Sequence, residues 1–390
     1  MDRSGLTILE LLAVTAIIAV ILGLVIPKLQ SAREATRLTF CSNQLRFAAI
    51  AVHNYHDAFE NLPTQLTGTR GPGPAGGYRP PGHNQYRLSG WVGLLPFMEA
   101  QSSWETISLG DAKWSPMGPP PWVREFDPWQ TDFYNLRCPS DAGFGLPAHG
   151  RTNYVFCLGD ATHRLDTGPV RFDRVSGRWT NDLVRQCAAS GRGVFVPRMT
   201  RTFASIQDGL AQTAMLGECI TDCGDGDIRT CGPMTVSWDV INNQPTWVEK
   251  NEWRDSNWVR YWAADGPVSA GLRTRPNDQR RGYRWADGAA LYTGFNTILP
   301  PNREIFLAGG DAGIGMLPPS SQHPGGVHVA MADASVRFVS DSIDAGDLTR
   351  PTVQWHPGED LPAEPVASPY GVWGAMGTRA SEEIPPESRP

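Results

Sequence analysis

An apolar segment near the start of the chain most constrains the fold. Leu6–Ile26 contains one charged residue, Glu10, and the basic residues Lys28, Arg33 and Arg37 follow it closely. At 1.5 Å per residue a helix over this segment is about 30 Å long, which is the thickness of the hydrocarbon core of a bilayer. An ionised carboxylate in that setting costs a few kcal/mol, so we expect Glu10 to have a partner.

The start of the chain resembles the type IV prepilin signal, in which a short basic leader ends in Gly and a Glu lies shortly after the new N-terminus. The resemblance implies that a prepilin peptidase cuts between Gly5 and Leu6 and methylates the new amine. It also implies that this amine neutralises Glu10 of a neighbouring copy or of another pilin-like subunit. The chain would then cross the inner (cytoplasmic) membrane once, with its N-terminus cytoplasmic and its large domain periplasmic or at the cell surface.

Two other interpretations of this segment remain open, a Sec signal peptide and an uncleaved anchor. A Sec signal has a shorter apolar core and a small-residue cleavage site, whereas here Glu10 interrupts the core and Lys28 lies in the cleavage region. The positive-inside rule alone, which counts Lys28, Arg33 and Arg37 against Arg3, would place the large domain in the cytoplasm. The leader motif favours the opposite orientation.

The helix is expected to continue beyond the membrane. Apolar residues at alternating three- and four-residue steps lie on one helical face: Leu38, Cys41, Leu45, Ala48, Val52, Tyr55 and Phe59. Pro27 should kink the helix where it leaves the bilayer, and Asn61-Leu62-Pro63 should end it. A helix that is half in lipid and half packed on a sheet is the pilin architecture. We therefore predict an α+β, pilin-like fold with the helix on an antiparallel β-sheet and a large loop-rich β extension.

Composition fits an anchored extracytoplasmic protein. The 390 residues carry a formal charge of −6 and a pI near 5.8, so we expect no nucleic-acid partner. Gly (41) and Pro (33) favour short strands and long ordered loops. The predicted organisation is a leader at 1–5, a transmembrane helix at 6–27, its amphipathic continuation at 28–60, a β-rich extracytoplasmic domain at 61–348 and a Pro/Glu-rich C-terminal tail at 349–390.

Short apolar runs within the predicted domain indicate strands. The runs are 153–156, 193–196 and 213–216, whereas the Gly- and Pro-rich stretch 64–89 is expected to be irregular. From Asp360 onward we expect a largely extended tail, which Tyr370, Val372 and Trp373 could dock onto the domain.

A β-hairpin is predicted near the C-terminal end of the domain. Val327, Val329 and Met331 alternate with smaller or polar residues, and apolar residues resume at Val336 and Phe338 after Asp333-Ala334. With His323, this passage resembles the H-x9-D-G signature of a planctomycete-type prepilin-like family of unknown function. Other passages resemble its landmarks in order: 33–35, 41–45, 53–57, 138–141, 153–154, 206–209, 216–218, 295–297 and 300–302.

The signature is more simply structural than catalytic. His323 and Asp333 could form an acid/base pair or bind a metal, but Pro324-Gly325-Gly326 beside the histidine is typical of a turn into a strand, which is the interpretation we favour. Ala334 stands where the family has Gly. A tight hairpin turn wants positive φ, which Ala resists at a cost of roughly 1 kcal/mol.

Two other clusters are weaker metal candidates. His53, His56 and Asp57 have helical spacing that can bind a metal, although helix-end polar residues usually serve in caps and docking contacts. Asp222, Asp225 and Asp227 form an oxygen-rich turn that could hold Ca²⁺, but it lacks the full EF-hand pattern and could equally be a solvated acidic loop. No other cofactor is expected.

The seven cysteines suggest disulfides in an oxidising compartment. Cys41 with Cys138 would staple the helix to the sheet, and Cys219, Cys223 and Cys231 offer a local bridge; spacing does not fix the connectivity. A zinc site is weakly supported, because only Cys219 and Cys223 have the close spacing usual for zinc ligands.

A tryptophan-rich stretch is the main argument for ligand binding. Trp247, Trp253, Trp258 and Trp262 alternate with polar residues, and aromatic faces stack on sugars, although indoles also cover small cores. The chain has no P-loop, G-x-S-x-G or H-E-x-x-H motif, so we expect no enzyme.

Three hypotheses about function follow. The leading one is a pilin-like or pseudopilin-like structural protein that assembles into a type II secretion or type IV pilus-like filament. The second is a membrane-tethered module that binds glycans or another surface ligand. The third is a hydrolase with an unrecognised site.

Overall fold

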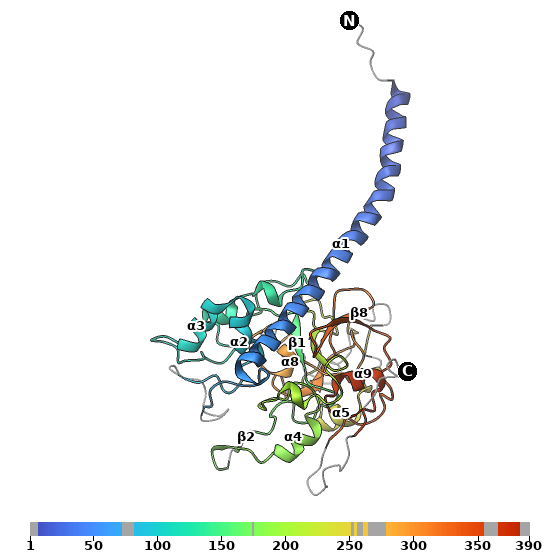
Figure 1. Cartoon of the computed structure of the whole chain (residues 1–390). Helices are drawn as coiled ribbons and strands as arrows, with labels where there is room; N and C mark the ends of the chain where they lie inside the picture. Colours follow the sequence, from blue (N-terminus) through green and yellow to red (C-terminus); the bar gives the residue numbers. More distant parts are fainter. Residues whose placement is uncertain are drawn as a thin grey trace.

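A long helix, α1 (Ile8–Phe59), extends out of a rounded body that the rest of the chain forms (Figure 1). This computed structural model describes residues 7–71, 82–173, 175–250, 253–255, 260–263, 278–354 and 366–382. Gly5, Leu6 and Trp258 lie outside the described residues. The 52 residues of α1 give a rod of about 78 Å, which is much longer than a membrane span requires.

Local signals define both ends of α1. Thr7 caps the N-terminus in a capping box, because its hydroxyl accepts from the Glu10 amide and the Glu10 carboxylate accepts from the Thr7 amide at 2.9 Å. Glu60 adopts the left-handed conformation (φ 57°) and its amide donates to the His56 carbonyl, which ends the helix just before the predicted stop. Pro27 lies inside α1 without interrupting it, although the rod is curved.

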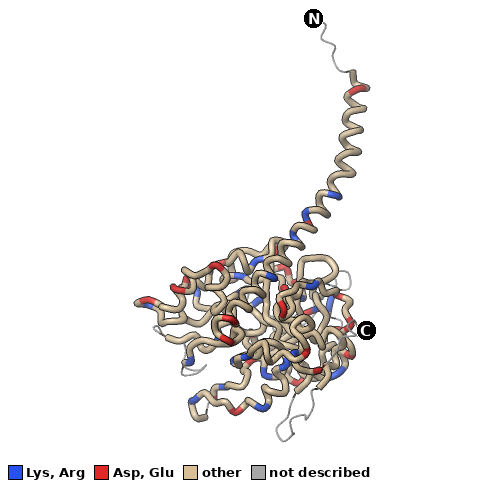
Figure 2. The backbone as a smooth tube through the Cα atoms, viewed as in Figure 1, with Lys and Arg blue, Asp and Glu red and all other residues tan. Residues whose placement is uncertain are grey.

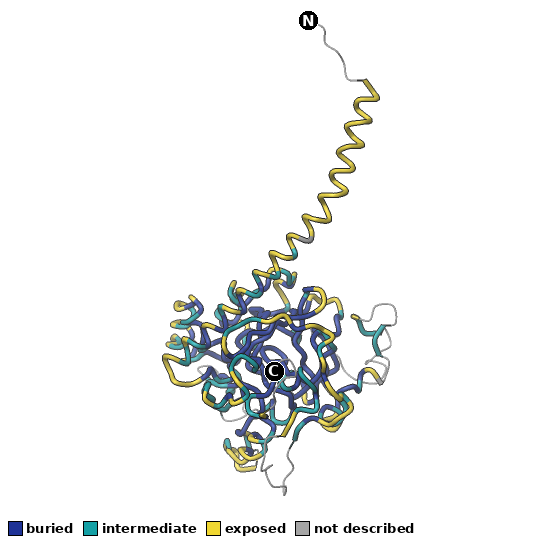
Figure 3. The backbone as a smooth tube through the Cα atoms, turned by 45° about the vertical axis from the view of Figure 1, so that its right-hand side comes forward, coloured by how far each residue is buried: buried dark blue, intermediate teal, exposed yellow. Residues whose placement is uncertain are grey.

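The two halves of α1 have opposite surroundings (Figure 3). Every described apolar side chain from Ile8 to Leu29 is exposed, and no charged residue lies between Glu10 and Lys28 (Figure 2). The second half lies against the body, where Cys41, Leu45 and Val52 are fully buried. This is the amphipathic continuation that the apolar stripe predicts.

A five-stranded sheet forms the centre of the body. Its strands run in the order β5 (Gly294–Phe295), β1 (Tyr154–Cys157), β4 (Ala214–Glu218), β8 (Gly326–Met331) and β9 (Val336–Ser340). All neighbours are antiparallel except β1 and β5, which pair in parallel. The β8–β9 hairpin is the one that the sequence predicts.

Alternation along the strands gives the sheet two apolar faces. On one face Phe156, Leu216 and Ala330 belong to the core that includes Leu45 and Ala48 of α1. On the other face Val155 and Val329 pack with Trp373. Each face of the sheet therefore has its own helical cover.

The cover of the second face comes from the predicted C-terminal tail. Residues 366–382 include helix α9 (Gly371–Gly377), in which Trp373 is fully buried and donates from Nε1 to the Leu299 carbonyl at 2.8 Å. Tyr370 is also fully buried and donates to the Arg350 carbonyl. This part of the tail is thus folded onto the body rather than extended.

The remaining elements are short and loop-connected, as the glycine and proline content predicts. They are α2 (Gly90–Leu94), η2 (Leu95–Met98), α3 (Gln101–Leu109), η3 (Asp127–Gln130), η4 (Tyr134–Leu136), β2 (Arg171–Asp173), β3 (Arg178–Thr180), α4 (Val184–Ser190), η5 (Phe203–Ser205), α5 (Trp238–Asn243), α6 (Trp247–Lys250), α8 (Ala290–Thr293), β6 (Phe306–Ala308) and β7 (Ile314–Met316). The expected α+β class, with a long N-terminal helix on a mainly antiparallel sheet, is confirmed.

One predicted strand is wrong. The apolar run 193–196 is buried but irregular, and its contribution to pairing is a single bridge between Val196 and Met199. The Phe195 amide donates to the Cys157 carbonyl, so this segment lies beside the end of β1 without extending it. The backbone of a short buried apolar run can form its hydrogen bonds in a strand or in an irregular segment. Periodicity alone does not distinguish the two.

Candidate functional site

The base of α1 is joined to the body by a disulfide between Cys41 and Cys138. Their Cα atoms lie 5.3 Å apart although 97 positions separate them in sequence. The Cys138 amide donates to Asn153 Oδ1, and the Tyr154 hydroxyl donates to the Cys41 carbonyl. The predicted staple between helix and sheet is confirmed.

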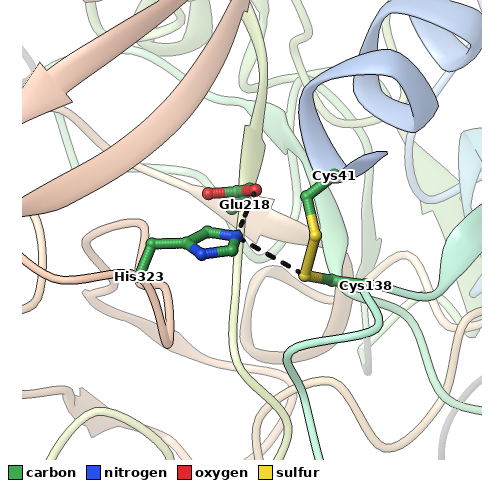
Figure 4. A group of neighbouring side chains, drawn as sticks. All are labelled: Cys41, Cys138, Glu218 and His323. Atoms are coloured by element: carbon green, nitrogen blue, oxygen red, sulfur yellow. Dashed lines mark hydrogen bonds and ion pairs between the residues drawn. A yellow bond between two sulfur atoms is a disulfide. The ribbon is translucent and has the colours of Figure 1, made fainter. Parts of the chain in front are cut away.

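His323 lies directly beside this disulfide (Figure 4). Its Nε2 is 3.8 Å from Cys138 Sγ and 3.9 Å from Glu218 Oε1, and its Nδ1 is 2.8 Å from Glu34 Oε1. The His323 side chain has no solvent exposure, whereas one third of the Glu34 side chain is exposed. A buried histidine therefore links the helix, the disulfide and the central strand.

Glu218 is the last residue of β4, on the face that α1 covers. Its side chain is 3% exposed, and its Oε2 accepts the His328 amide of the neighbouring strand β8 at 2.8 Å. Its Oε1 lies 3.1 Å from His328 Nδ1. The central strands thus hold this carboxylate in place and turn it toward His323.

The approach to β8 fixes His323. Ser321 Oγ accepts the His323 amide, while the Ser321 carbonyl accepts a bond of 2.7 Å from the Arg229 guanidinium. Gly325 then takes φ 85°, and a Cβ on Gly326 would lie 2.1 Å from the Val339 carbonyl oxygen. These two glycines make the turn into the strand that the sequence indicates.

Asp333 lies at the other end of β8, so the structure does not bring the two signature residues together. It is exposed in the β8–β9 turn, where its Oδ1 accepts from the amide and hydroxyl of Ser335. The Ala334 amide donates to the Met331 carbonyl, and Ala334 takes φ 65°. This geometry belongs to a hairpin loop with one left-handed residue.

The candidate Ca²⁺ ligands already have other partners. Asp222 accepts from the hydroxyls of Thr230 and Tyr283. Asp227 pairs with the guanidinium of Arg229 at 2.8 Å and also with Arg260, and burial raises the pKa of this carboxyl despite the Arg260 charge. Asp225 is exposed. The Ca²⁺ site stays a prediction.

The described part of the tryptophan-rich stretch is half-buried. Trp247 and Trp253 meet edge to face at 4.6 Å, and Trp262 donates from Nε1 to the Cys231 carbonyl. A cavity of about 430 Å³ adjoins Trp262. Its lining residues are Pro147, Asp222, Gly224, Asp225, Gly226, Cys231, Tyr261, Trp262, Arg280 and Tyr283.

The local bridge that the later cysteines offered is not formed. Cys219, Cys223 and Cys231 are all free thiols, and Cys223 alone among the three is exposed. Burial raises the pKa of both Cys219 and Cys231 to about 12, which disfavours the reactive thiolate.

The histidines near the end of α1 make docking contacts. His53 stacks on Phe203 and its Nε2 lies 2.9 Å from the Ala332 carbonyl, in the β8–β9 turn. His56 also contacts the Phe203 ring, and Asp57 is exposed. These contacts match the structural interpretation of the cluster.

Sequence reasoning missed three residues of the site: Glu34, Glu218 and His328. Glu34 and Glu218 lie within the passages 33–35 and 216–218, which resemble family landmarks. The resemblance marked both residues but indicated no function for them. Both glutamates lie far from His323 in the sequence, and Glu34 is 289 positions away. Sequence spacing does not predict that such distant residues meet.

These observations define a class of protein. Within the described residues α1 is long and apolar enough to cross a membrane, although an N-terminal signal sequence can share its length and composition. This helix and the domain behind it fit a membrane-anchored extracellular domain. The family model described as "Protein of unknown function (DUF1559)" matches residues 30–346, and the chain belongs to this family. No curated protein and no solved structure matches the chain.

Proposed function

We propose that this protein is a membrane-anchored, pilin-like or pseudopilin-like structural subunit that a prepilin peptidase processes. The observation that carries the proposal is the exposed half of α1. Apart from Glu10 and Lys28, the helix carries no charge from Ile8 to Leu29, and its apolar side chains there are exposed around the whole circumference, while the same helix continues into the core. A helix that is hydrophobic all round needs lipid or other helices around it.

The proposal places the chain in the inner membrane as a single-pass protein. The apolar half of α1 lies in the bilayer, its N-terminus faces the cytoplasm, and the domain lies in the periplasm or at the cell surface. Extraction of such helices into a bundle would form a type II secretion or type IV pilus-like filament. The role is structural rather than catalytic, and the partners are the peptidase and other pilin-like subunits or further copies of this chain.

Mass spectrometry of the N-terminus tests processing. The full-length protein, extracted from membranes, is expected to begin at Leu6 with a methylated amine. An intact Met1, or a new N-terminus beyond Ile26 as a Sec signal would give, contradicts the proposal.

Glu10 tests assembly, and the capping box supplies matched variants. Glu10→Gln removes the charge but keeps a residue that can complete the capping box with Thr7. Thr7→Ala removes the cap but keeps the carboxylate. If Glu10 pairs with a neighbour's amine, co-purification of tagged and untagged copies falls at least about tenfold for Glu10→Gln, since ~1.4 kcal/mol of lost pairing has that effect.

Thr7→Ala is expected to leave co-purification unchanged once N-terminal mass spectrometry shows normal processing. Equal losses for both variants would mean that the cap, and not the charge, supports assembly. Unchanged assembly for Glu10→Gln would remove the argument for a filament.

We propose ligand binding at the cavity beside Trp262 as a second candidate function. Tyr261, Trp262 and Tyr283 supply aromatic faces there, and Asp225 and Arg280 supply polar groups, which together suit a glycan. Saturable binding of the full-length protein on a glycan array, lost in Trp262→Ala and kept in Trp247→Ala, would support this function. Trp247 is a suitable control because it does not line the cavity.

A further inference from the structure

Four side chains at the base of α1 place one donor atom each within 4.8 Å of all the others: Cys41, Cys138, Glu218 and His323. All four residues are buried and come from distant parts of the chain. We infer that this cluster is a closed divalent-metal site of the zinc type, which forms when the Cys41–Cys138 pair is in its dithiol state.

The separations of the donor atoms fit a tetrahedral ion. Bonds of about 2.0 Å to nitrogen or oxygen and about 2.3 Å to sulfur place N and S about 3.5 Å apart, and N and O about 3.3 Å apart, around a tetrahedral centre. His323 Nε2 lies 3.8 Å from Cys138 Sγ and 3.9 Å from Glu218 Oε1. The sulfur atoms are the donors that must separate, because a bond joins them in the oxidised state.

The surrounding hydrogen bonds orient the donors. A carboxylate only accepts, so the 2.8 Å contact with Glu34 Oε1 puts the proton of a neutral His323 on Nδ1 and leaves the Nε2 lone pair directed at Cys138 and Glu218. The His328 amide holds Glu218 Oε2. Carboxylate-to-histidine contacts of this kind are typical of the outer sphere of zinc sites.

The donor set and its enclosure favour zinc. Two thiolates, one imidazole and one carboxylate match Zn²⁺, whereas Mg²⁺ and Ca²⁺ require oxygen ligands. The adjoining cavity, lined in part by Cys138 and Glu218, holds about 10 Å³, which is the room for about one water. Four protein donors without an open position make a structural site rather than a catalytic one.

The two states of the site exclude each other. A dithiol reductant supplies two electrons and two protons to the disulfide and becomes a disulfide itself, which leaves Cys41 and Cys138 as thiols. Each thiol then loses a proton as its sulfur binds the ion. Either the S–S bond or the metal thereby ties α1 to the segment after η4, so the base of the helix is held in both redox states.

Cobalt substitution tests the site in the full-length protein in detergent. The protein is reduced with a dithiol, desalted without oxygen and titrated with Co²⁺, whose thiolate charge-transfer and visible d–d bands report a tetrahedral sulfur-containing site. The expected result is one Co²⁺ per reduced chain, displaced by Zn²⁺, and no such spectrum from the oxidised chain. Absence of the spectrum after reduction, or the same spectrum from the oxidised chain, overturns the inference.

Variants separate this site from the other thiols. His323→Gln should weaken Co²⁺ binding by more than about 100-fold, and Glu34→Gln by about 10- to 100-fold, since loss of an outer-sphere partner costs that much. Glu34 is partly exposed, so its variant tests the site without a buried change. Cys223→Ser removes the exposed free thiol and should bind as the wild type does.

Equal affinity of Glu34→Gln, His323→Gln and the wild type, or loss of binding in Cys223→Ser, overturns the inference. The test does not depend on leader cleavage or on assembly.

Discussion

The two halves of α1 show how one continuous helix can belong to two environments. From Ile8 to Leu29 its apolar side chains cover the whole circumference and are exposed, whereas from Cys41 to Val52 they occupy one face and are buried against the sheet. The first half is more hydrophobic and is apolar all round, whereas the second half is rich in polar residues and confines its apolar residues to one face. A single apolar face can pack against other parts of the same chain. A helix that is apolar all round needs lipid or helices of other molecules around it.

The boundary between the halves is where the candidate site lies. Glu34 stands on the helix just before the buried part, and Cys41 is the first residue of α1 that the structure describes as fully buried. Both contact the cluster that holds His323 and Glu218. The disulfide and the Glu34–His323 contact therefore join the helix to the body at this boundary.

Removal of the disulfide should have the largest effect on this boundary. Chain-entropy arguments give about 4.7 kcal/mol for a loop of about 100 residues, and native disulfides typically contribute 2–5 kcal/mol. The Cys41→Ala/Cys138→Ala double variant should lose that much free energy of unfolding, measured by guanidinium denaturation of the full-length protein in detergent with a chelator present. Tryptophan fluorescence suits the measurement, because all 14 tryptophans follow residue 90 and report on the body alone. Cys223→Ser should change little, and an equal loss there would mean that the staple does not matter.

Matched truncations in the two halves test the comparison itself. Leu45→Ala removes a fully buried side chain and should cost about 2–5 kcal/mol of unfolding free energy, measured by the same fluorescence signal. Leu22→Ala removes a half-exposed side chain and should leave the body's stability unchanged. If both variants destabilise the body alike, the exposed half also packs against the body. The two halves of α1 would then share one environment.

Acid should act on the body through His149. Burial first, and then the charges of Arg284 and Arg124, lower its pKa from 6.5 to about 3. Between these values the unfolded chain binds the proton and the folded chain does not, so stability is complete above pH 6.5 and falls as the pH drops toward 3. A single group contributes at most about 1.4 kcal/mol per pH unit.

His149→Gln should therefore flatten the loss of stability below pH 6.5. Denaturation series at several pH values between 7 and 4 give the slope. An unchanged slope would show that His149 does not carry this pH dependence.

Much of the fold could be predicted from local pattern. Three patterns depend only on residues close in sequence: the apolar run of the first half of α1, the apolar stripe of its second half and the alternation at 327–338. The helix and the hairpin occur where these patterns lie. The strand prediction at 193–196 was wrong because a short buried apolar segment has no periodicity that distinguishes a strand from an irregular segment. The folded tail was predicted less well, since the docking of Trp373 depends on a sheet face built from residues elsewhere in the chain.

The candidate site was predictable only in part. The sequence suggested Cys41–Cys138 as a staple between helix and sheet and left the connectivity open. It gave a zinc site only weak support, from the spacing of Cys219 and Cys223, and did not point to the four-residue cluster. Its donors lie at positions 41, 138, 218 and 323, and tertiary folding alone makes them neighbours. Sequence proximity detects ligands that share a loop or helix and misses those that a sheet assembles.

The smallest effect is expected in the β8–β9 turn, where the far end of α1 docks through the His53 contact with the Ala332 carbonyl. Ala334 takes φ 65° there, a conformation that costs a non-glycine residue roughly 1 kcal/mol. Ala334→Gly should recover about that amount of unfolding free energy. Ala332→Gly is the matched control, because Ala332 is fully buried and its φ is not positive, so glycine there should destabilise by about 0.5–1 kcal/mol. Opposite signs from two alanines two positions apart would locate the strain at Ala334, and a loss in both variants would show that the turn relaxes in solution.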